Sequence, residues 1–191
     1  MHQEQDETGV ADGRGGAGVA GVAGVAGVAG RVDHAALGSD PVENARRIAA
    51  AFGADDQSLT SRMGIKIIEA SARRSVATMP VAGNTQPYGL LHGGASCVLA
   101  ETVGSLGAAL HAGPGKFTVG IEINATHHRS ASSGLVTAVA TMAHGGSTLV
   151  THDIVITDDQ GRRVCTARLS CLVRDAVPGR EPDSPAQAGD V

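Results

Sequence analysis

Residues 93–112 read GGASCVLAETVGSLGAALHA, and almost all of them are small or apolar. An apolar run of about five helical turns without a polar face predicts a helix that is buried on most sides. Segments with the pattern of β-strands lie before and after it, at 63–70, 71–81, 116–128, 133–144, 147–157 and 162–174. One long apolar helix among antiparallel strands predicts an α+β fold in which a curved sheet wraps around the helix.

The ends of the chain differ in composition from this core. A short helix is expected over 40–52, where Asp40 can act as N-cap and Pro41 can take the first helical position. Residues 1–38 contain repeated Gly-Val-Ala triplets, which bury too little area to offset backbone ordering, so they predict a disordered leader. Residues 176–191 predict a disordered tail, which leaves 39–175 as the folded domain.

Charge and composition argue against several classes of partner. The formal net charge is −4, the acidic excess lies in the two terminal segments, and aromatic residues make up 2% of the chain. These features provide neither the basic surface nor the stacking side chains that nucleic-acid binding uses. They provide no polybasic membrane anchor either. We therefore expect no nucleic-acid partner and no membrane partner.

The cysteines bear on the cellular compartment. Cys97, Cys165 and Cys171 lie in apolar or strand-like runs, and no CxxC motif is present. This usage predicts reduced cysteines that pack in the core. The first residues, MHQEQDE, are acidic and do not resemble the basic start of a secretory signal. A cytoplasmic location is the expectation.

Glu101 is the most informative single position, because it lies in the middle of the apolar helix. A carboxylate that is buried there without partners is costly, and burial would raise its pKa toward the range that suits acid–base chemistry. The alternative is that Glu101 lies on an exposed edge or forms a structural ion pair. Ser105 follows four residues later on the same helical face and could orient the carboxylate or a water molecule.

The segment LHGG, residues 91–94, begins the same helix. Glycines at a helix start let a ligand approach free backbone N–H groups, which favour negative charge and could stabilise an oxyanion. An ordinary glycine-containing helix start is the alternative. Gly93 and Glu101 are separated by ~12 Å along the helix axis, too far for one carbonyl to contact both. If both act on one substrate, they come from different subunits, which predicts a homodimer with sites at its interface.

The stretches QPYGLLHGGASCVLAETVGS, residues 86–105, and VGIEINATHHR, residues 119–129, carry a family resemblance. They resemble the hotdog-fold acyl-CoA thioesterases over about residues 60–175. The likeness is greatest to the branch that holds phenylacetate-pathway thioesterases, Arthrobacter-type 4-hydroxybenzoyl-CoA thioesterases and 1,4-dihydroxy-2-naphthoyl-CoA hydrolases. The combined pattern of Gln, His-Gly-Gly, Glu and Ser at these spacings is specific, whereas His-Gly-Gly alone would be weak.

The resemblance implies a role for each matching residue. Glu101 matches the catalytic carboxylate, which acts as a nucleophile or as a general base. The N–H of Gly93 matches the group that polarises the thioester carbonyl. Gln86 and His92 match residues that position the thioester and the helix turn, and Ser105 occupies a place where relatives carry Ser or Thr. Relatives place the carboxylate and the glycine amide across a dimer interface and commonly pair dimers into tetramers.

Two further segments are candidates for contacts with CoA. His127, His128 and Arg129 close a strand-like run and could meet pantetheine or phosphates. Adjacent histidines point to opposite faces of a strand, so a metal site is not expected there. Gly146, Ser147 and Thr148 could cradle a phosphate or an amide, and a plain hairpin is the alternative.

The expected activity is therefore hydrolysis of an acyl-CoA thioester, with an aromatic acyl group favoured. No metal and no cofactor beyond the CoA of the substrate are expected. Two other functions remain open on the same fold. One is a 3-hydroxyacyl dehydratase or enoyl-CoA hydratase, and the other is an acyl-CoA-binding protein without catalysis.

Overall fold

The computed structural model describes residues 34–52 and 58–175. The tail expected at 176–191 lies outside the described residues, as does the leader up to residue 33. Residues 34–38, which composition grouped with the leader, include a short 3-10 helix, η1 (His34–Ala36). They are joined to α2 (Pro41–Phe52), because the Gly38 N–H donates to Asn44 Oδ1 at 2.9 Å.

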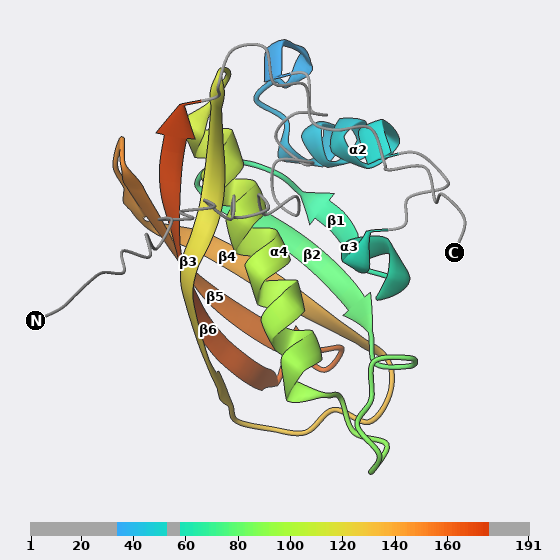
Figure 1. Cartoon of the computed structure of the whole chain (residues 1–191). Coiled ribbons are helices and arrows are strands. Elements are labelled where there is room, and N and C mark those ends of the chain that lie inside the picture. The colour runs from blue at the N-terminus through green and yellow to red at the C-terminus, as the bar shows by residue number, and fades with distance from the viewer. Residues whose placement is uncertain (1–33, 53–57, 176–191) are drawn as a thin grey trace, which may run out of the picture.

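Six antiparallel strands form one sheet in the order β1-β2-β4-β5-β6-β3. Their bounds are β1 Lys66–Glu69, β2 Arg74–Pro80, β3 Lys116–His127, β4 Leu135–Gly145, β5 Leu149–Asp158 and β6 Arg163–Asp175. The sheet curves around the long helix α4 (Gly93–Ala112), which crosses its face (Figure 1). The expected α+β hotdog architecture is confirmed.

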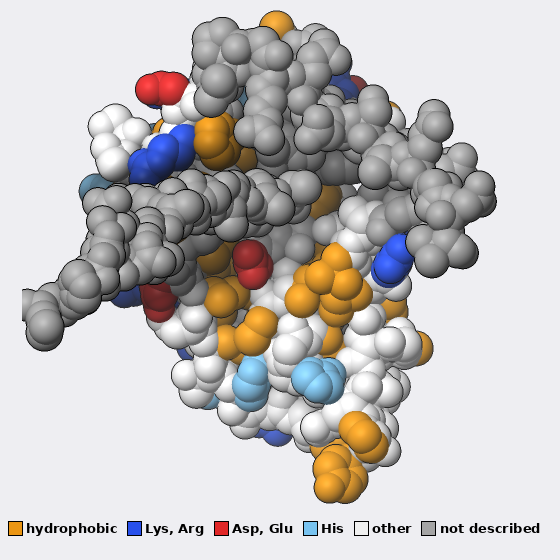
Figure 2. Space-filling view, viewed as in Figure 1, with side chains coloured by type: hydrophobic (Ala, Val, Ile, Leu, Met, Phe, Trp, Pro, Cys, Tyr) orange, Lys and Arg blue, Asp and Glu red, His pale blue; other side chains and the backbone are white. Residues whose placement is uncertain are grey.

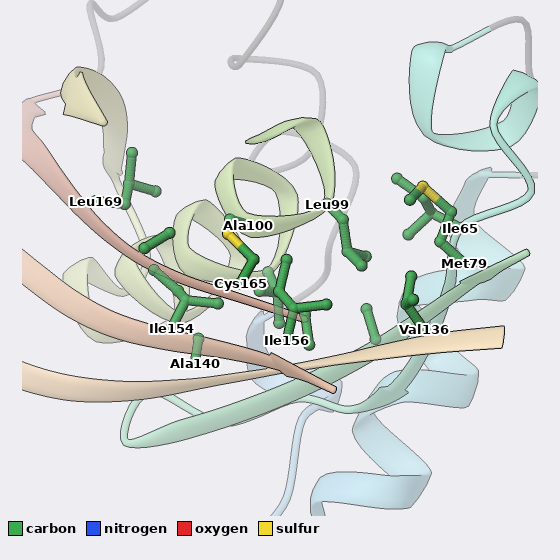
Figure 3. Close-up of a cluster of buried hydrophobic side chains, with 14 of the residues drawn as sticks. Ile65, Met79, Leu99, Ala100, Val136, Ala140, Ile154, Ile156, Cys165 and Leu169 are labelled. Carbon is green, nitrogen blue, oxygen red and sulfur yellow. The ribbon is translucent and has the colours of Figure 1, made fainter. Parts of the chain in front are cut away.

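The helix α4 is the centre of the core. Leu99 and Ala100 are fully buried, and Figure 3 shows them facing Ile154 and Ile156 of the sheet. Among the described residues, α4 is the one helix long and apolar enough to cross a membrane, and 56% of its apolar window is buried inside the protein. That burial is typical of the core helix of a folded domain.

The small residues of α4 have a packing role. A Cβ atom at Gly104 would lie 2.8 Å from Leu169 Cδ2, and one at Gly107 would lie 2.5 Å from His152 Nε2. Both distances are shorter than van der Waals contact. The glycines therefore let the helix approach the sheet closely.

The structure adds elements that the sequence pattern did not predict. The short helix α3 (Leu59–Arg62) precedes β1 and is capped by Ser58, whose side chain accepts a hydrogen bond from the Ser61 N–H.

All three cysteines are free. Cys165 and Cys171 are buried as expected, and burial raises the pKa of each thiol to about 11, whereas Cys97 is half-buried.

His152 on β5 is a buried histidine, 1% exposed, whose ring Nε2 lies 3.0 Å from the Ala72 carbonyl oxygen. Burial lowers the pKa of His152 below its ordinary 6.5, and repulsion from His111 lowers it further. The hydrogen bond to Ala72 and the charge of Asp153 act in the opposite direction without cancelling this shift. The folded chain therefore binds this proton more weakly than the unfolded chain does.

This depressed pKa predicts an acid-sensitive fold. As the pH falls through 6.5, the unfolded chain takes up a proton that folded His152 resists, so the free energy of unfolding falls. We expect His152→Gln, whose amide can still donate to Ala72, to lose less stability between pH 7 and pH 5. Urea unfolding at several pH values measures this slope. The exposed His144→Gln is the control, and equal slopes in all three proteins would contradict the prediction.

Candidate active site

The N-terminal end of α4 is held by a tight loop over residues 84–92. Thr85 and Leu91 form an isolated antiparallel bridge, and the Gln86 N–H donates to the Leu90 carbonyl at 2.8 Å. The Asn84 side chain donates to the carbonyls of Met63 and Pro80, each at 2.9 Å, which anchors the loop to the sheet. The loop thus fixes the entry of the chain into α4.

His92 is the N-cap of α4. Its Nδ1 accepts a hydrogen bond from the Gly94 N–H at 2.8 Å, and its backbone is extended. The Gly93 N–H, at the first helical position, has no acceptor in the part of the chain that the structure describes. His92 therefore occupies the second N–H of the helix and leaves the first free to meet a ligand.

Gly93, which carries this free N–H, lines a cavity of about 410 Å³. From the loop and α4, its lining includes Gln86, Leu90, Leu91, Gly93 and Ser96. The end of β3 adds His127 and the residues that follow it, through Ser130. Figure 2 shows histidine side chains gathered on the face that holds the start of α4. A concave site with apolar walls and a few convergent polar groups is the usual form of a small-molecule site.

The two histidines at the end of β3 depart from the expected geometry. A strand would direct them to opposite faces, but β3 ends at His127, and both residues line the same cavity. His127 packs directly on the helix start, because a Cβ at Gly93 would lie 2.9 Å from His127 Nε2. His128 Nε2 lies 2.9 Å from Thr166 Oγ1, which holds its ring against β6.

Glu101 lies two turns along α4 and is absent from the lining of this cavity. Its side chain is exposed in the single chain, which agrees with the exposed-edge alternative and not with burial inside one protomer. Its carboxylate lies over Gly120 of β3, where an added Cβ would stand 3.3 Å from Oε1. The missing side chain at Gly120 forms a notch beside the carboxylate.

Ser105 lies beside Cys171 of β6, where the serine hydroxyl lowers the pKa of that thiol against the larger, opposite effect of burial. The described residues show no hydrogen bond between Ser105 and Glu101. The hairpin residues Gly146, Ser147 and Thr148 also lie away from the cavity. They follow β4 and approach the other end of α4, where Gly146 accepts a hydrogen bond from His111 Nε2 at 3.2 Å.

The sequence reasoning missed some residues of the cavity. Ser96 is 1% exposed and lines it, and Ser130 does so from the segment after β3. The spacing of Ser96, three residues after Gly93 on the same helical face, could have indicated it. In the described part of the chain, no group of three or more His, Cys, Asp or Glu side chains is placed to hold a metal ion.

Several known proteins are similar to this chain in sequence and in fold. The thioesterase superfamily matches residues 88–165. The proofreading thioesterase EntH of Cronobacter turicensis is 47% identical over 116 residues, which are 60% of this chain and 85% of that one. A crystal structure of a Haemophilus influenzae thioesterase has a TM-score of 0.65 and 35% identity, covering 75% of this chain and 97% of that one.

A protein from Staphylococcus aureus adds a comparison of positions. Its structure has a TM-score of 0.60 and 34% identity, covering 62% of this chain and 99% of that chain, and was solved with one glutamate replaced by alanine. A second structure of the same protein, called a thioesterase, carries alanine in place of a glutamine 15 residues earlier. From the fold and these relatives together, we conclude that the chain belongs to the thioesterase superfamily and is a thioester hydrolase.

Proposed function

We propose that this chain hydrolyses acyl-CoA thioesters to a free acid and CoA, with an aromatic acyl group favoured. The observation that carries the proposal is that Gly93, whose N–H at the start of α4 is free, lines one cavity together with Gln86 and His127. A further support is spacing. Gln86 and Glu101 are 15 residues apart, as are the glutamine and glutamate replaced in the Staphylococcus aureus structures.

The chemistry of the proposal assigns one role to each group. The Gly93 N–H and the positive end of α4 stabilise the negative charge that develops on the thioester oxygen. The Gln86 amide, which has no partner among the described residues, holds the thioester. His92 positions the helix turn, because its Nδ1 accepts the hydrogen bond from the Gly94 N–H.

Glu101 supplies the attack on the carbonyl carbon, in one of two ways. As a nucleophile, its carboxylate forms a mixed anhydride, the C–S bond breaks, and the CoA thiolate leaves and takes up a proton; water then cleaves the anhydride. As a general base, it takes a proton from a water molecule whose oxygen attacks, and the same C–S bond breaks. Both routes consume one water and give one acid and one thiol.

The proposal requires a second copy of the chain. Gly93 and Glu101 are ~12 Å apart along α4, so the carboxylate at each site comes from the partner protomer. Strand β3 is at the edge of the sheet, twelve residues long, and Ile121 on it is 54% exposed. An unpaired edge of this length is a template for pairing with a second copy. We place the dimer interface there, and two dimers could join as a tetramer.

The remaining assignments complete the proposal. His127, His128 and Arg129 contact the CoA part of the substrate from the protomer that supplies Gly93. Gly146, Ser147 and Thr148 contact it from the hairpin after β4 of the protomer that supplies Glu101. CoA belongs to the substrate, and no other cofactor or metal takes part. The branch that acts on phenylacetyl, 4-hydroxybenzoyl or dihydroxynaphthoyl esters is favoured by the motif around residues 86–105. The protein works in the cytoplasm.

A panel of CoA esters tests the reaction, with release of free thiol followed by a thiol-reactive dye. The panel holds 1,4-dihydroxy-2-naphthoyl, 4-hydroxybenzoyl, phenylacetyl, hexanoyl and palmitoyl esters. We expect aryl esters to be turned over faster than the alkyl esters. Faster release from the alkyl esters would overturn the aryl preference. No release from any ester by the folded protein, or hydration of crotonyl-CoA, would overturn the proposed reaction.

The notch at Gly120 gives a milder test of the carboxylate. Gly120→Ala places a Cβ 3.3 Å from the present position of Glu101 Oε1, so the carboxylate must shift by a few tenths of an ångström. We expect kcat to fall roughly tenfold while KM is retained, because small misplacements of reacting groups are costly. Thermal unfolding should show no loss of stability, since alanine suits a strand better than glycine. An unchanged kcat would contradict the assignment.

A further inference from the structure

A second cavity, of about 350 Å³, lies at the opposite end of α4 from Gly93. Its lining includes Arg73 from the turn before β2, His111 from the last turn of α4, and Met142, His144 and Gly145 from the end of β4. Arg73 and His144 are exposed and His111 is half-buried, so the side chains are open to solvent. None of the groups proposed for catalysis lies in this cavity.

The one formally charged side chain in the lining is the guanidinium of Arg73. None of its residues is an Asp or a Glu. Within the described ranges Arg73 forms no ion pair, whereas its neighbour Arg74 is paired with Glu69. An unpaired guanidinium beside two imidazoles is suited to an anion with several oxygen atoms, because guanidinium can bind a phosphate with two hydrogen bonds.

The backbone around the cavity is arranged to admit the two imidazoles. A Cβ at Gly145 would lie 2.9 Å from His111 Cε1, and one at Gly146 would lie 2.9 Å from His144 Nε2. The absence of side chains at these glycines lets both rings lie against the hairpin. The turn that carries Arg73 is anchored to β5, because buried His152 donates a hydrogen bond to the Ala72 carbonyl at 3.0 Å.

We propose that this second cavity binds a phosphoryl group, with Arg73 as the main ligand and His111 and His144 beside it. The preferred source of this phosphoryl group is the CoA of the substrate, and in that respect the inference rests on the proposed function. Ten residues of α4 separate Glu101 from His111, which is ~15 Å along the axis. The pantetheine chain of CoA has about thirteen bonds between the sulfur and the first phosphorus. Four residues of extended polypeptide have about as many backbone bonds, so the pantetheine chain also spans ~15 Å. Free phosphate is the other source of the same chemistry.

Binding without turnover tests the proposal. Calorimetry with the full chain compares CoA, pantetheine and inorganic phosphate on wild type, Arg73→Ala and His144→Gln. The control is Arg46→Ala, which removes an arginine on α2 whose side chain is 75% exposed and paired with Glu43. We expect Arg73→Ala to weaken CoA binding about tenfold, with a smaller loss for His144→Gln. Pantetheine binding should be unchanged in all variants, and Arg46→Ala should match wild type.

Each outcome has a distinct meaning. Loss of affinity for inorganic phosphate in Arg73→Ala, with CoA binding unchanged, would support the phosphoryl site and assign it to the free anion. Equal weakening of CoA and pantetheine, or no dependence of CoA or phosphate binding on Arg73, would overturn it. The proposed function fails separately, because an absence of thiol release leaves these affinities measurable. If hydrolysis is observed, Arg73→Ala should raise KM for CoA esters and retain kcat.

Discussion

Glu101→Gln is expected to lower kcat for the preferred CoA ester by roughly 10³-fold and to leave KM within about twofold. The amide has the shape of the carboxylate but can neither attack a carbonyl nor accept a proton from water. The side chain is exposed in the single chain, so the substitution leaves no buried group without a partner. Folding should therefore be retained, and steady-state thiol release measures the loss.

The matched control for this variant is Glu43→Gln. Glu43 is a carboxylate on α2 whose side chain is 43% exposed and is paired with Arg47 at 3.1 Å, and the substitution removes the same charge away from α4. We expect its kcat to equal that of wild type. Turnover by Glu101→Gln within tenfold of wild type would exclude the carboxylate as nucleophile and as base, and would leave the Gly93 end of the helix as the catalytic element.

Much of the fold could be predicted because its deciding segment is unambiguous. Residues 93–112 have no polar face, and the structure places α4 at Gly93–Ala112. The bounds of the last four strands were predicted to within two residues, since turn residues such as those at 158–161 separate them. The short helix α3 was missed, because four residues are too few to show helical periodicity.

The candidate site was predicted less completely, because it depends on contacts between distant segments. The helix start was evident from LHGG, but the packing of His127 on Gly93 joins residues 34 positions apart. Local patterning also could not show that Ser105 would lie beside Cys171 on β6. The exposure of Glu101 has a related cause, since an apolar sequence neighbourhood predicts burial but does not say whether the covering surface belongs to the same chain.

Activity restored in a heterodimer of two inactive variants is the second large effect that we expect. One chain carries Glu101→Gln and the other carries Gln86→Ala, each with a different affinity tag, and heterodimers are isolated by both tags after co-expression. If Gly93 and Gln86 of one protomer act with Glu101 of the other, the heterodimer holds one intact site and one site with both defects. It should then have about half the kcat of the wild-type dimer, far above either parent.

The placement of both substitutions in one chain reverses this expectation. A heterodimer of wild type with the double variant Gln86→Ala/Glu101→Gln has one defect at each interface site, so it should be nearly inactive. If each site were instead formed within one protomer, this heterodimer would retain half of the activity and the first would have little. The two arrangements contain the same substitutions in the same total number, so loss of stability cannot produce the difference. Activity in the first heterodimer and not in the second requires that Gln86 and Gly93 of one protomer act with Glu101 of the other. This is the arrangement that the ~12 Å separation of Gly93 and Glu101 along α4 predicts.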